Sequence, residues 1–259
     1  MYMFTVLAVG DVTGEAGLYC AKEKIWSLRS EYSVDLCVVN GENAATSNGI
    51  DPFAADALLN FGADIVTTGN HVFQKREMYS YLDDKLSVLR PANYPGACPG
   101  RGYTIENFAG RRVLIINLMG TLFMDALENP FNQLERILAE TAGRYDLSVL
   151  DFHAEATSEK LSMGYFADGK VDIIFGTHTH VQTADARVLP NGSGYITDLG
   201  QTGVIDSVLG AVPKICIERF RTKMPIPYQP AQGEYALCGA VFRWDPVTKK
   251  TVSVEAVRR

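Results

Sequence analysis

The sequence contains no long run of lysine and arginine, and its net charge is negative. Of its 259 residues, 24 are Lys or Arg and 30 are Asp or Glu, which gives a formal net charge of −6 and a pI near 5.3. A protein that binds nucleic acid stably needs a basic face to neutralise the phosphates. We therefore expect no stable nucleic-acid grip, although a small anion such as a free nucleotide needs only a local positive site.

Paired cysteines and long apolar runs are also missing. The five cysteines are widely separated, odd in number and include no C-x-x-C pair, which is typical of reduced thiols in a cytoplasmic protein. No apolar segment has the length needed to span a bilayer. The apolar stretch 1–9 lacks a basic start and soon reaches Asp11, so it predicts a first strand rather than a signal peptide. We expect a cytoplasmic protein with no membrane contact.

The apolar content, 47% of the residues, is sufficient for a large core, and we expect one domain over residues 1–259. In the first two thirds of the chain, short apolar runs alternate with amphipathic stretches. This alternation predicts a largely parallel sheet with helices packed outside it. The expected helices cover residues 15–30, 51–61, 131–141 and 156–167.

From about residue 185 the pattern changes to β-type runs separated by turns, which predicts a second, largely antiparallel sheet packed on the first. The Pro-rich segment 224–234 predicts an extended loop or an edge arm. The fold class is therefore α/β, a two-sheet β-sandwich flanked by helices. The β-type runs cover residues 186–190, 193–199, 213–220, 236–244 and 251–257.

Polar residues directly follow several of the predicted strands. Ligand sites in open α/β sheets form at the carboxyl ends of parallel strands, so we expect these side chains to converge. Core packing does not require strand ends to carry every histidine of a chain, and the group therefore predicts a metal site. The candidates, which include all four histidines, are Asp11, Glu42, Asn43, Asn70, His71, His153, His178 and His180.

His178 and His180 are one residue apart, directly behind the apolar run 171–175. Residues i and i+2 of an extended segment point to the same side, so both imidazoles are expected to face one cleft, with Thr177 facing away. One cation could take both rings, but two cations make better use of the remaining donors. Glu42 could then bridge the ions at the separation of about 3.5–4 Å found in two-metal sites.

In their order along nearly the whole chain, these blocks resemble the calcineurin-like metallophosphoesterases. Two blocks depart from the usual superfamily pattern. Thr13 stands where D-x-H has its histidine, and Gly41-Glu42-Asn43 stands where G-D-x-x-D/N-R is usual. The YmdB-like branch, which looks like 2′,3′-cyclic nucleotide phosphodiesterases, shares both departures. The matching blocks are Asp11, N-G-E-N at 40–43, G-N-H at 69–71, His153 and T-H-T-H at 177–180.

The resemblance implies a centre of two divalent or trivalent metal ions, iron or manganese, and the donor set also suits zinc or cobalt. The first implied ligand set is Asp11, Glu42, Asn43 and His180. The second is Glu42, Asn70, His153 and His178. The implied reaction is hydrolysis of a small phosphodiester, most readily a 2′,3′-cyclic nucleotide, by attack of a metal-bound hydroxide.

His71 is the one histidine that neither ligand set needs, and we expect it to protonate the leaving oxygen as general acid. The alternative is that its imidazole orients a ligand. Glu155 and Glu159 are expected to stabilise the N-terminus of a following helix electrostatically rather than to act in the site.

Other functions stay open at this point. One is a phosphatase or phosphodiesterase for phosphoprotein or RNA ends, because the arginine that often binds phosphate elsewhere in the superfamily is missing after Asn43. Another is a signalling module that binds nucleotide, with incidental catalysis. A phosphate loop at 10–17 is weakly indicated, since its glycines lack the G-x-G-x-x-G spacing and no P-loop lysine follows. The segment 220–235 and the resemblance indicate a homo-oligomer.

Overall fold

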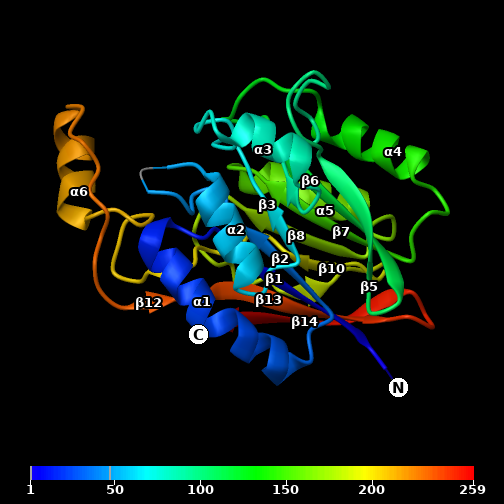
Figure 1. The fold of residues 1–259 in the computed structure, drawn as a ribbon. Coiled ribbons are helices and arrows are strands. Elements are labelled where there is room, and N and C mark those ends of the chain that lie inside the picture. The colour runs from blue at the N-terminus through cyan, green and yellow to red at the C-terminus, as the bar shows by residue number, and fades with distance from the viewer. Residues whose placement is uncertain (1, 47) are drawn as a thin grey trace.

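The structure, a computed structural model, describes residues 2–46 and 48–259. This part of the chain forms two six-stranded sheets, a small two-stranded sheet and flanking helices (Figure 1). None of the helices in the described ranges combines the length and the apolar character that crossing a membrane requires.

The first sheet has the strand order β14-β13-β1-β2-β3-β4. Its strands β1 to β4 pair in parallel. β13 pairs antiparallel with β1 and with β14, so the C-terminal hairpin closes one edge of the sheet. The bounds are β1 Phe4–Val9, β2 Leu36–Asn40, β3 Ile65–Thr67, β4 Val88–Leu89, β13 Cys238–Asp245 and β14 Lys250–Arg258.

The second sheet has the order β5-β6-β7-β8-β10-β9, with β6, β7, β8 and β10 parallel and an antiparallel strand at each edge. Its bounds are β5 Tyr103–Phe108, β6 Arg111–Met119, β7 Leu147–His153, β8 Ile173–Thr177, β9 Arg187–Val188 and β10 Gly194–Ile196. The small sheet pairs β11 Gly203–Val204 with β12 Tyr235–Ala236.

The predicted two-sheet α/β sandwich is confirmed, but its division into one largely parallel and one largely antiparallel sheet is wrong. Both sheets are mixed. The parallel strands of the first two thirds of the chain divide between the two sheets, and β13 and β14 return to the edge of the first sheet. An apolar run encodes which faces of a strand are buried but not which neighbour it pairs with, so this division is not readable locally.

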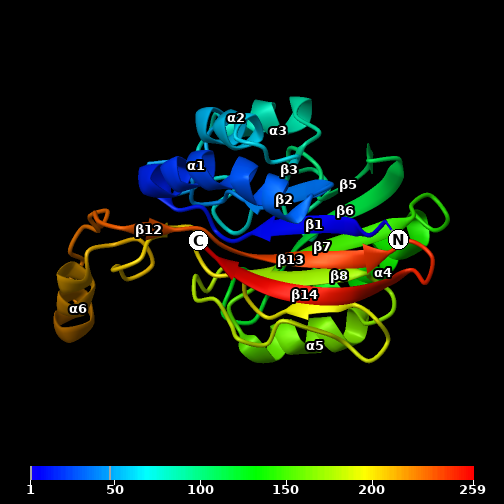
Figure 2. The same cartoon turned by 90° about the horizontal axis from the view of Figure 1, so that it is seen from below.

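The two sheets pack face to face, and helices cover their outer faces (Figure 2). The central core contains Val6 of β1 and Val38 of β2 against Val149 of β7 and Phe175 of β8, all of them fully or almost fully buried. Helices α1, α2 and α3 cover the first sheet, and α4 and α5 cover the second. The helix bounds are α1 Gly14–Tyr32, α2 Pro52–Asn60, α3 Met78–Asp84, α4 Pro130–Glu140, α5 Thr157–Ala167 and α6 Pro213–Thr222.

The four predicted helices are confirmed to within a residue or two, and α2 and α4 have clear start signals in the sequence. The carboxylate of Asp51 accepts the N–H of Ala54 at 2.8 Å, and Pro52 opens α2. Asn129 caps α4 in the same way, ahead of Pro130. A side-chain cap followed by proline is a strong helix start. The short α3 was not predicted.

The prediction of a strand over residues 213–220 is wrong, because this segment forms α6. Pro213 occupies the first helical turn, where its missing N–H costs nothing. The sheltered side chains Ile215, Cys216 and Arg219 recur at helical spacing instead of alternating. Figures 1 and 2 show α6 standing apart from the body, joined to it by the predicted extended segment 224–234.

A buried ion pair holds the segment that follows β8. Lys160 of α5 donates to a carboxylate oxygen of Asp198 and to the backbone carbonyl of Thr177. The side chains of Lys160 and Asp198 are 2% and 1% exposed. Asp198 also accepts the N–H groups of Thr179 at 3.2 Å and Gly200 at 2.8 Å. The pair thereby ties a helix to the backbone that carries His178 and His180.

We predict that Lys160→Met lowers the free energy of unfolding by about 3–5 kcal/mol, because it leaves the carboxylate of Asp198 buried without its counter-charge. Urea denaturation followed by circular dichroism measures this. Lys85→Met is the matched control: Lys85 pairs with Asp56 on the surface, with side chains 43% and 48% exposed, and its loss should cost less than about 1 kcal/mol. Equal losses in the two variants would contradict the structural role of the buried pair.

Candidate metal centre

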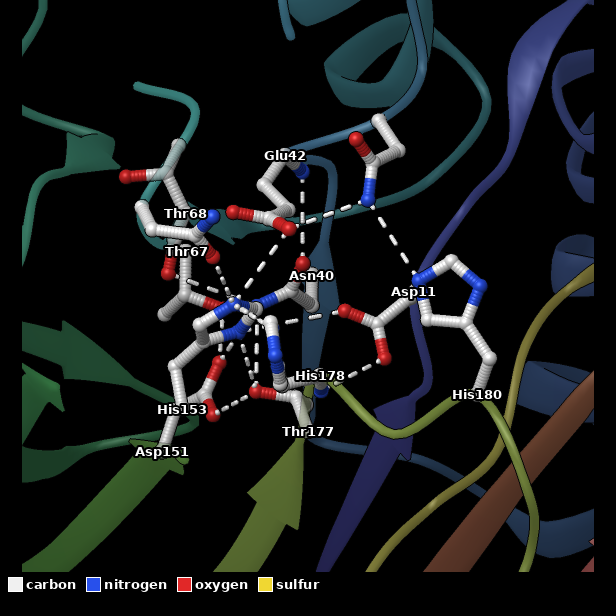
Figure 3. A network of polar contacts seen from close by, with 12 residues as sticks. Asp11, Asn40, Glu42, Thr67, Thr68, Asp151, His153, Thr177, His178 and His180 are labelled. Carbon is white, nitrogen blue, oxygen red and sulfur yellow. Dashed lines mark hydrogen bonds and ion pairs between the residues drawn. The ribbon is translucent and has the colours of Figure 1, made fainter. Parts of the chain in front are cut away.

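The carboxyl ends of strands from both sheets meet at one place, where Figure 3 shows Asp11, Glu42, His153, His178 and His180 together. Hydrogen bonds place Asn43, Asn70 and His71 in the same group. Asp11 follows β1, Glu42 follows β2, and His153 ends β7. Asp11, Glu42 and His153 are completely buried. The described side chains of this group are connected by short polar contacts, so the predicted convergence of strand ends is what the structure shows.

One half of the group is a tight cluster around His153. Its Nε2 lies 3.3 Å from Oε1 of Glu42, 3.0 Å from Oδ1 of Asn70 and 3.0 Å from Nδ1 of His178. Glu42, His153 and His178 offer ligand atoms that all lie within 4.8 Å of one another. This spacing suits coordination of one cation by several donors.

The other half lies on the opposite side of Glu42. Nδ2 of Asn43 lies 2.9 Å from Oε1 of Glu42 and 3.4 Å from Nε2 of His180. Nδ1 of His71 lies 2.9 Å from Oδ1 of Asn43. In Figure 3, His180 is separated from His153 and His178 by Asp11. Glu42 thus contacts both halves of the site.

The expectation of an extended segment at 177–180 is wrong. β8 ends at Thr177, and both His178 (φ 95°) and His180 (φ 65°) adopt left-handed backbone conformations. A left-handed histidine is uncommon and is tolerated where the surroundings hold it. Here the N–H of His178 donates to Asp11 at 3.0 Å. The turn sends the two imidazoles to different halves of the site.

Thr177 does not face away, as the sequence predicts, but contacts the site. Its hydroxyl donates to Oδ1 of Asp151 at 2.7 Å and lies 2.9 Å from Nδ1 of His153. Since the hydroxyl proton is engaged by Asp151, Nδ1 of His153 must be the donor of the second bond. In the neutral form of His153, which is the form that binds metal, Nε2 is then the unprotonated nitrogen, and it faces the cluster.

The same logic assigns the other two rings. Nε2 of His178 faces the Glu155 carboxylate at 3.0 Å, so this nitrogen carries the proton and Nδ1 is the free one. Nδ1 of His180 faces Oε1 of Gln201 at 3.2 Å, which leaves Nε2 free. In each of His153, His178 and His180 the nitrogen that faces outward is held by an acceptor, and the free nitrogen faces the cluster.

The residues present fit a bound metal ion. Oδ1 of Asp11 is buried and has no hydrogen-bond partner among the described residues, which is costly for a carboxylate unless a cation satisfies it. Nε2 of His153 and Nδ1 of His178 face each other at 3.0 Å, so either a proton or a metal ion must lie between them. Imidazole, carboxylate and amide oxygen are suitable donors for iron, manganese, zinc or cobalt.

The pKa shifts reflect the competition between burial and the opposite charges that this cluster brings together. Burial lowers the pKa of His153, but the carboxylates of Glu42 and Asp11 outweigh it and bring the pKa up to about 9. Burial raises the pKa of Asp11 to about 6, opposed by His180 and His153. Burial, reinforced by the charge on His153, lowers the pKa of His178 to about 3. Burial also disfavours charge on Glu42, but the histidines keep its pKa well below the usual range.

Several residues that support the site were missed by sequence reasoning. Asp151 is completely buried and accepts hydrogen bonds from Asn40 at 3.0 Å, from Thr67 and from Thr177. An acidic residue inside the apolar run of β7 was a signal that could have found it. Glu155 was assigned to a helix start, yet it contacts His178. Nothing in the sequence marks Gln201 or Lys160.

Solved structures of other proteins share this architecture over the whole chain. A crystal structure from Mycoplasma pneumoniae, described as a novel phosphatase, has a TM-score of 0.94 and 35% identity, and the match covers 100% of this chain and 94% of the other. A crystal structure of a hypothetical protein from Thermus thermophilus has a TM-score of 0.92 and 36% identity, with 99% of each chain covered. The fold, together with the histidine and carboxylate centre at its strand ends, defines a metallophosphoesterase, a hydrolase of phosphate esters.

Sequence comparison places the chain more narrowly. A family model described as YmdB-like protein matches residues 7–257. The 2′,3′-cyclic-nucleotide 2′-phosphodiesterase of Bacillus subtilis strain 168 is 42% identical over 252 residues, which are 97% of this chain and 96% of the relative. The chain belongs to the YmdB-like family, and the family resemblance inferred from its motifs is confirmed.

Gly69 of the G-N-H block provides a test of the cluster. A Cβ at this position would overlap Nε2 of His153 and Oε2 of Glu42, so only glycine lets these groups approach. We predict that Gly69→Ala lowers metal affinity about 10- to 100-fold, measured by elemental analysis and competition with a chelator. Gly96→Ala is the control, because a Cβ there meets nothing within 4 Å. Unchanged metal content in Gly69→Ala would refute the assignment of this cluster.

Proposed function

We propose that the chain is a dinuclear-metal phosphodiesterase that hydrolyses 2′,3′-cyclic nucleotides. The observation that carries the proposal is the set of three imidazoles, each held by an outer acceptor, that gather with the buried carboxylates of Glu42 and Asp11 at one end of the sandwich. The activity for which the Bacillus subtilis relative is named supports the choice of substrate. Iron or manganese as the metal, and a homo-oligomeric assembly, stay predictions.

The two halves of the site match the two proposed ligand sets. Asp11 and His180 would hold one ion, together with Oδ1 of Asn43, which in this structure faces His71. Asn70, His153 and His178 would hold the other. Glu42 would bridge them, because its Oε1 contacts Nε2 of His153 and Nδ2 of Asn43. The bound ions would supply an activated water nucleophile and neutralise charge on the phosphoryl oxygens. Among the proposed ligands only Asp11 and Glu42 are anionic. With two divalent ions bound, the site would therefore keep a net positive charge that favours an anionic diester.

His71 is proposed to act on the leaving group. Water adds to phosphorus, the bond from phosphorus to one ribose oxygen breaks, and that oxygen takes up a proton. His71 is part-exposed, and its Nδ1 lies against Oδ1 of Asn43, which supports an Nδ1-protonated ring whose other edge is free to reach the substrate. The same contact would also let His71 orient Asn43, and the variant below separates the two roles.

A phosphomonoester substrate is the second candidate. The Mycoplasma pneumoniae structure that shares the fold is described as a phosphatase. A metal centre that activates water can serve both ester types, so the substrate depends on the surroundings of the centre. Hydrolysis of 2′,3′-cyclic, 3′,5′-cyclic and monoester nucleotides, compared at equal concentration, ranks the candidates.

His71→Ala should lower kcat for 2′,3′-cyclic AMP about 10²–10⁴-fold, because the leaving ribose oxygen needs a proton. For a p-nitrophenyl diester, whose leaving group departs unprotonated, the loss should be much smaller. Steady-state kinetics with both substrates, plus metal analysis, measures this. An equal loss with both substrates, or a loss of metal, would instead assign His71 to the orientation of Asn43.

Glu42→Gln should remove most of one metal ion per chain, since the neutral amide has only one oxygen donor and lacks the charge that holds two cations. Elemental analysis of protein purified without added metal gives the stoichiometry of the wild type and the variant. Glu31→Gln, which changes a surface carboxylate that pairs with Arg259, is the charge-matched control. If Glu42→Gln still binds two ions with unchanged affinity, the bridging role is wrong.

A further inference from the structure

A cavity of about 330 Å³ lies on the His180 side of the centre. His180 belongs both to the metal cluster and to the lining of this cavity, so the cavity begins where the ligand set ends. Its volume lies at the lower end of the range of about 300–1,000 Å³ that small-molecule sites occupy. The cavity is therefore placed and sized for a part of a small substrate whose phosphate lies at the centre.

The lining combines apolar and polar side chains in similar measure. Val204 of β11 and Ala236 of β12 contribute apolar surface. Ile205 and Leu209, in the segment that follows β11, also line the cavity although they are 41% and 54% exposed. Arg258 adds the cationic group of the lining. A nucleoside offers both an apolar ring face and polar edges, so a mixed lining suits it, and the guanidinium of Arg258 could stack on the base.

Leu209 occupies a conformation that its residue type disfavours. Val208 and Ala211 exchange two backbone hydrogen bonds of 2.9 Å each across a two-residue turn formed by Leu209 and Gly210. Both turn residues have positive φ, 53° and 85°, as a type I′ turn requires. Asparagine or glycine is favoured at Leu209's position, so an apolar side chain there implies that the side chain itself is needed.

The turn packs directly on the segment that carries Asp11. A Cβ at Gly210 would lie 2.5 Å from Cγ2 of Thr13, two residues beyond Asp11. On the other side, Gln201 joins the cavity to the metal cluster. Its Oε1 faces His180, and its Nε2 donates to the carbonyl of Val204 at 3.0 Å and to the hydroxyl of Ser207 at 3.2 Å. The cavity wall and the centre are thus one connected unit.

We propose that this cavity binds the nucleoside part of the substrate, with Leu209 and Ile205 packed against the base. The inference rests on the proposed function, since it assumes that the phosphate of a nucleotide lies at the centre. Leu209 is then a specificity residue. It favours diesters that carry a base and has no role in the chemical step.

The test uses Leu209→Gly, because glycine adopts the left-handed conformation without strain and the variant should fold as the wild type does. For 2′,3′-cyclic AMP we expect KM to rise about tenfold with kcat nearly unchanged. For ethylene cyclic phosphate, which has no ribose or base, both parameters should be unchanged. Adenosine 3′-phosphate should bind about tenfold more weakly by calorimetry. Leu209→Asn, which also tolerates positive φ but is polar, should behave similarly.

Val247→Gly is the control, since Val247 is a 68% exposed apolar residue beyond the far end of β13. An equal KM change with both substrates, no change with either, or an altered oligomeric state without a KM effect would overturn the inference. If the wild type hydrolyses neither substrate, the proposed function fails, and the binding of adenosine 3′-phosphate still tests the cavity. If the wild type hydrolyses both equally well, only the cavity assignment fails.

Discussion

The centre depends on one constraint, which is that each imidazole has a single nitrogen to give to a cation. An acceptor on the outer side of the ring decides which nitrogen that is. For His153 this acceptor is the Thr177 hydroxyl, and its direction is set by the buried carboxylate of Asp151. Asp151 also accepts hydrogen bonds from Asn40 and Thr67, so one buried carboxylate links strands β2, β3, β7 and β8. Hydrogen bonds behind the candidate ligands therefore determine which histidine nitrogen faces the site.

The division of the parallel strands between two sheets explains how these supporting hydrogen bonds around Asp151 arise. β2 and β3 belong to the first sheet and β7 and β8 to the second, and their carboxyl ends meet across the sandwich. The core between the sheets is apolar, but at this end it gives way to a polar network. The Lys160–Asp198 pair supports the site from outside the second sheet. It fixes the backbone turn that directs His178 and His180 into different halves of the site.

How far sequence reasoning reaches is clear from particular residues. Asp11, Glu42 and His153 were selected correctly as members of one group, because each directly follows or ends a strand and strand ends converge. The extended geometry of 177–180 was wrong, because a left-handed histidine depends on contacts with Asp11 and Asp198 that are distant in the chain. The strand at 213–220 was wrong because apolar content was given more weight than the proline that begins α6. Gln201 and Lys160 have no local pattern at all.

By itself, the sequence determined the chemical inventory and the class of protein: which donors are available, that they lie at strand ends, and that their order matches the YmdB-like family. These properties are local, since they depend on residue type and hydrophobic period. Only the tertiary structure decided which strands share a sheet, which nitrogen of each histidine is free, and that a small hairpin beside His180 forms a cavity. Those properties depend on contacts between segments far apart in the chain, and no local pattern encodes such pairings.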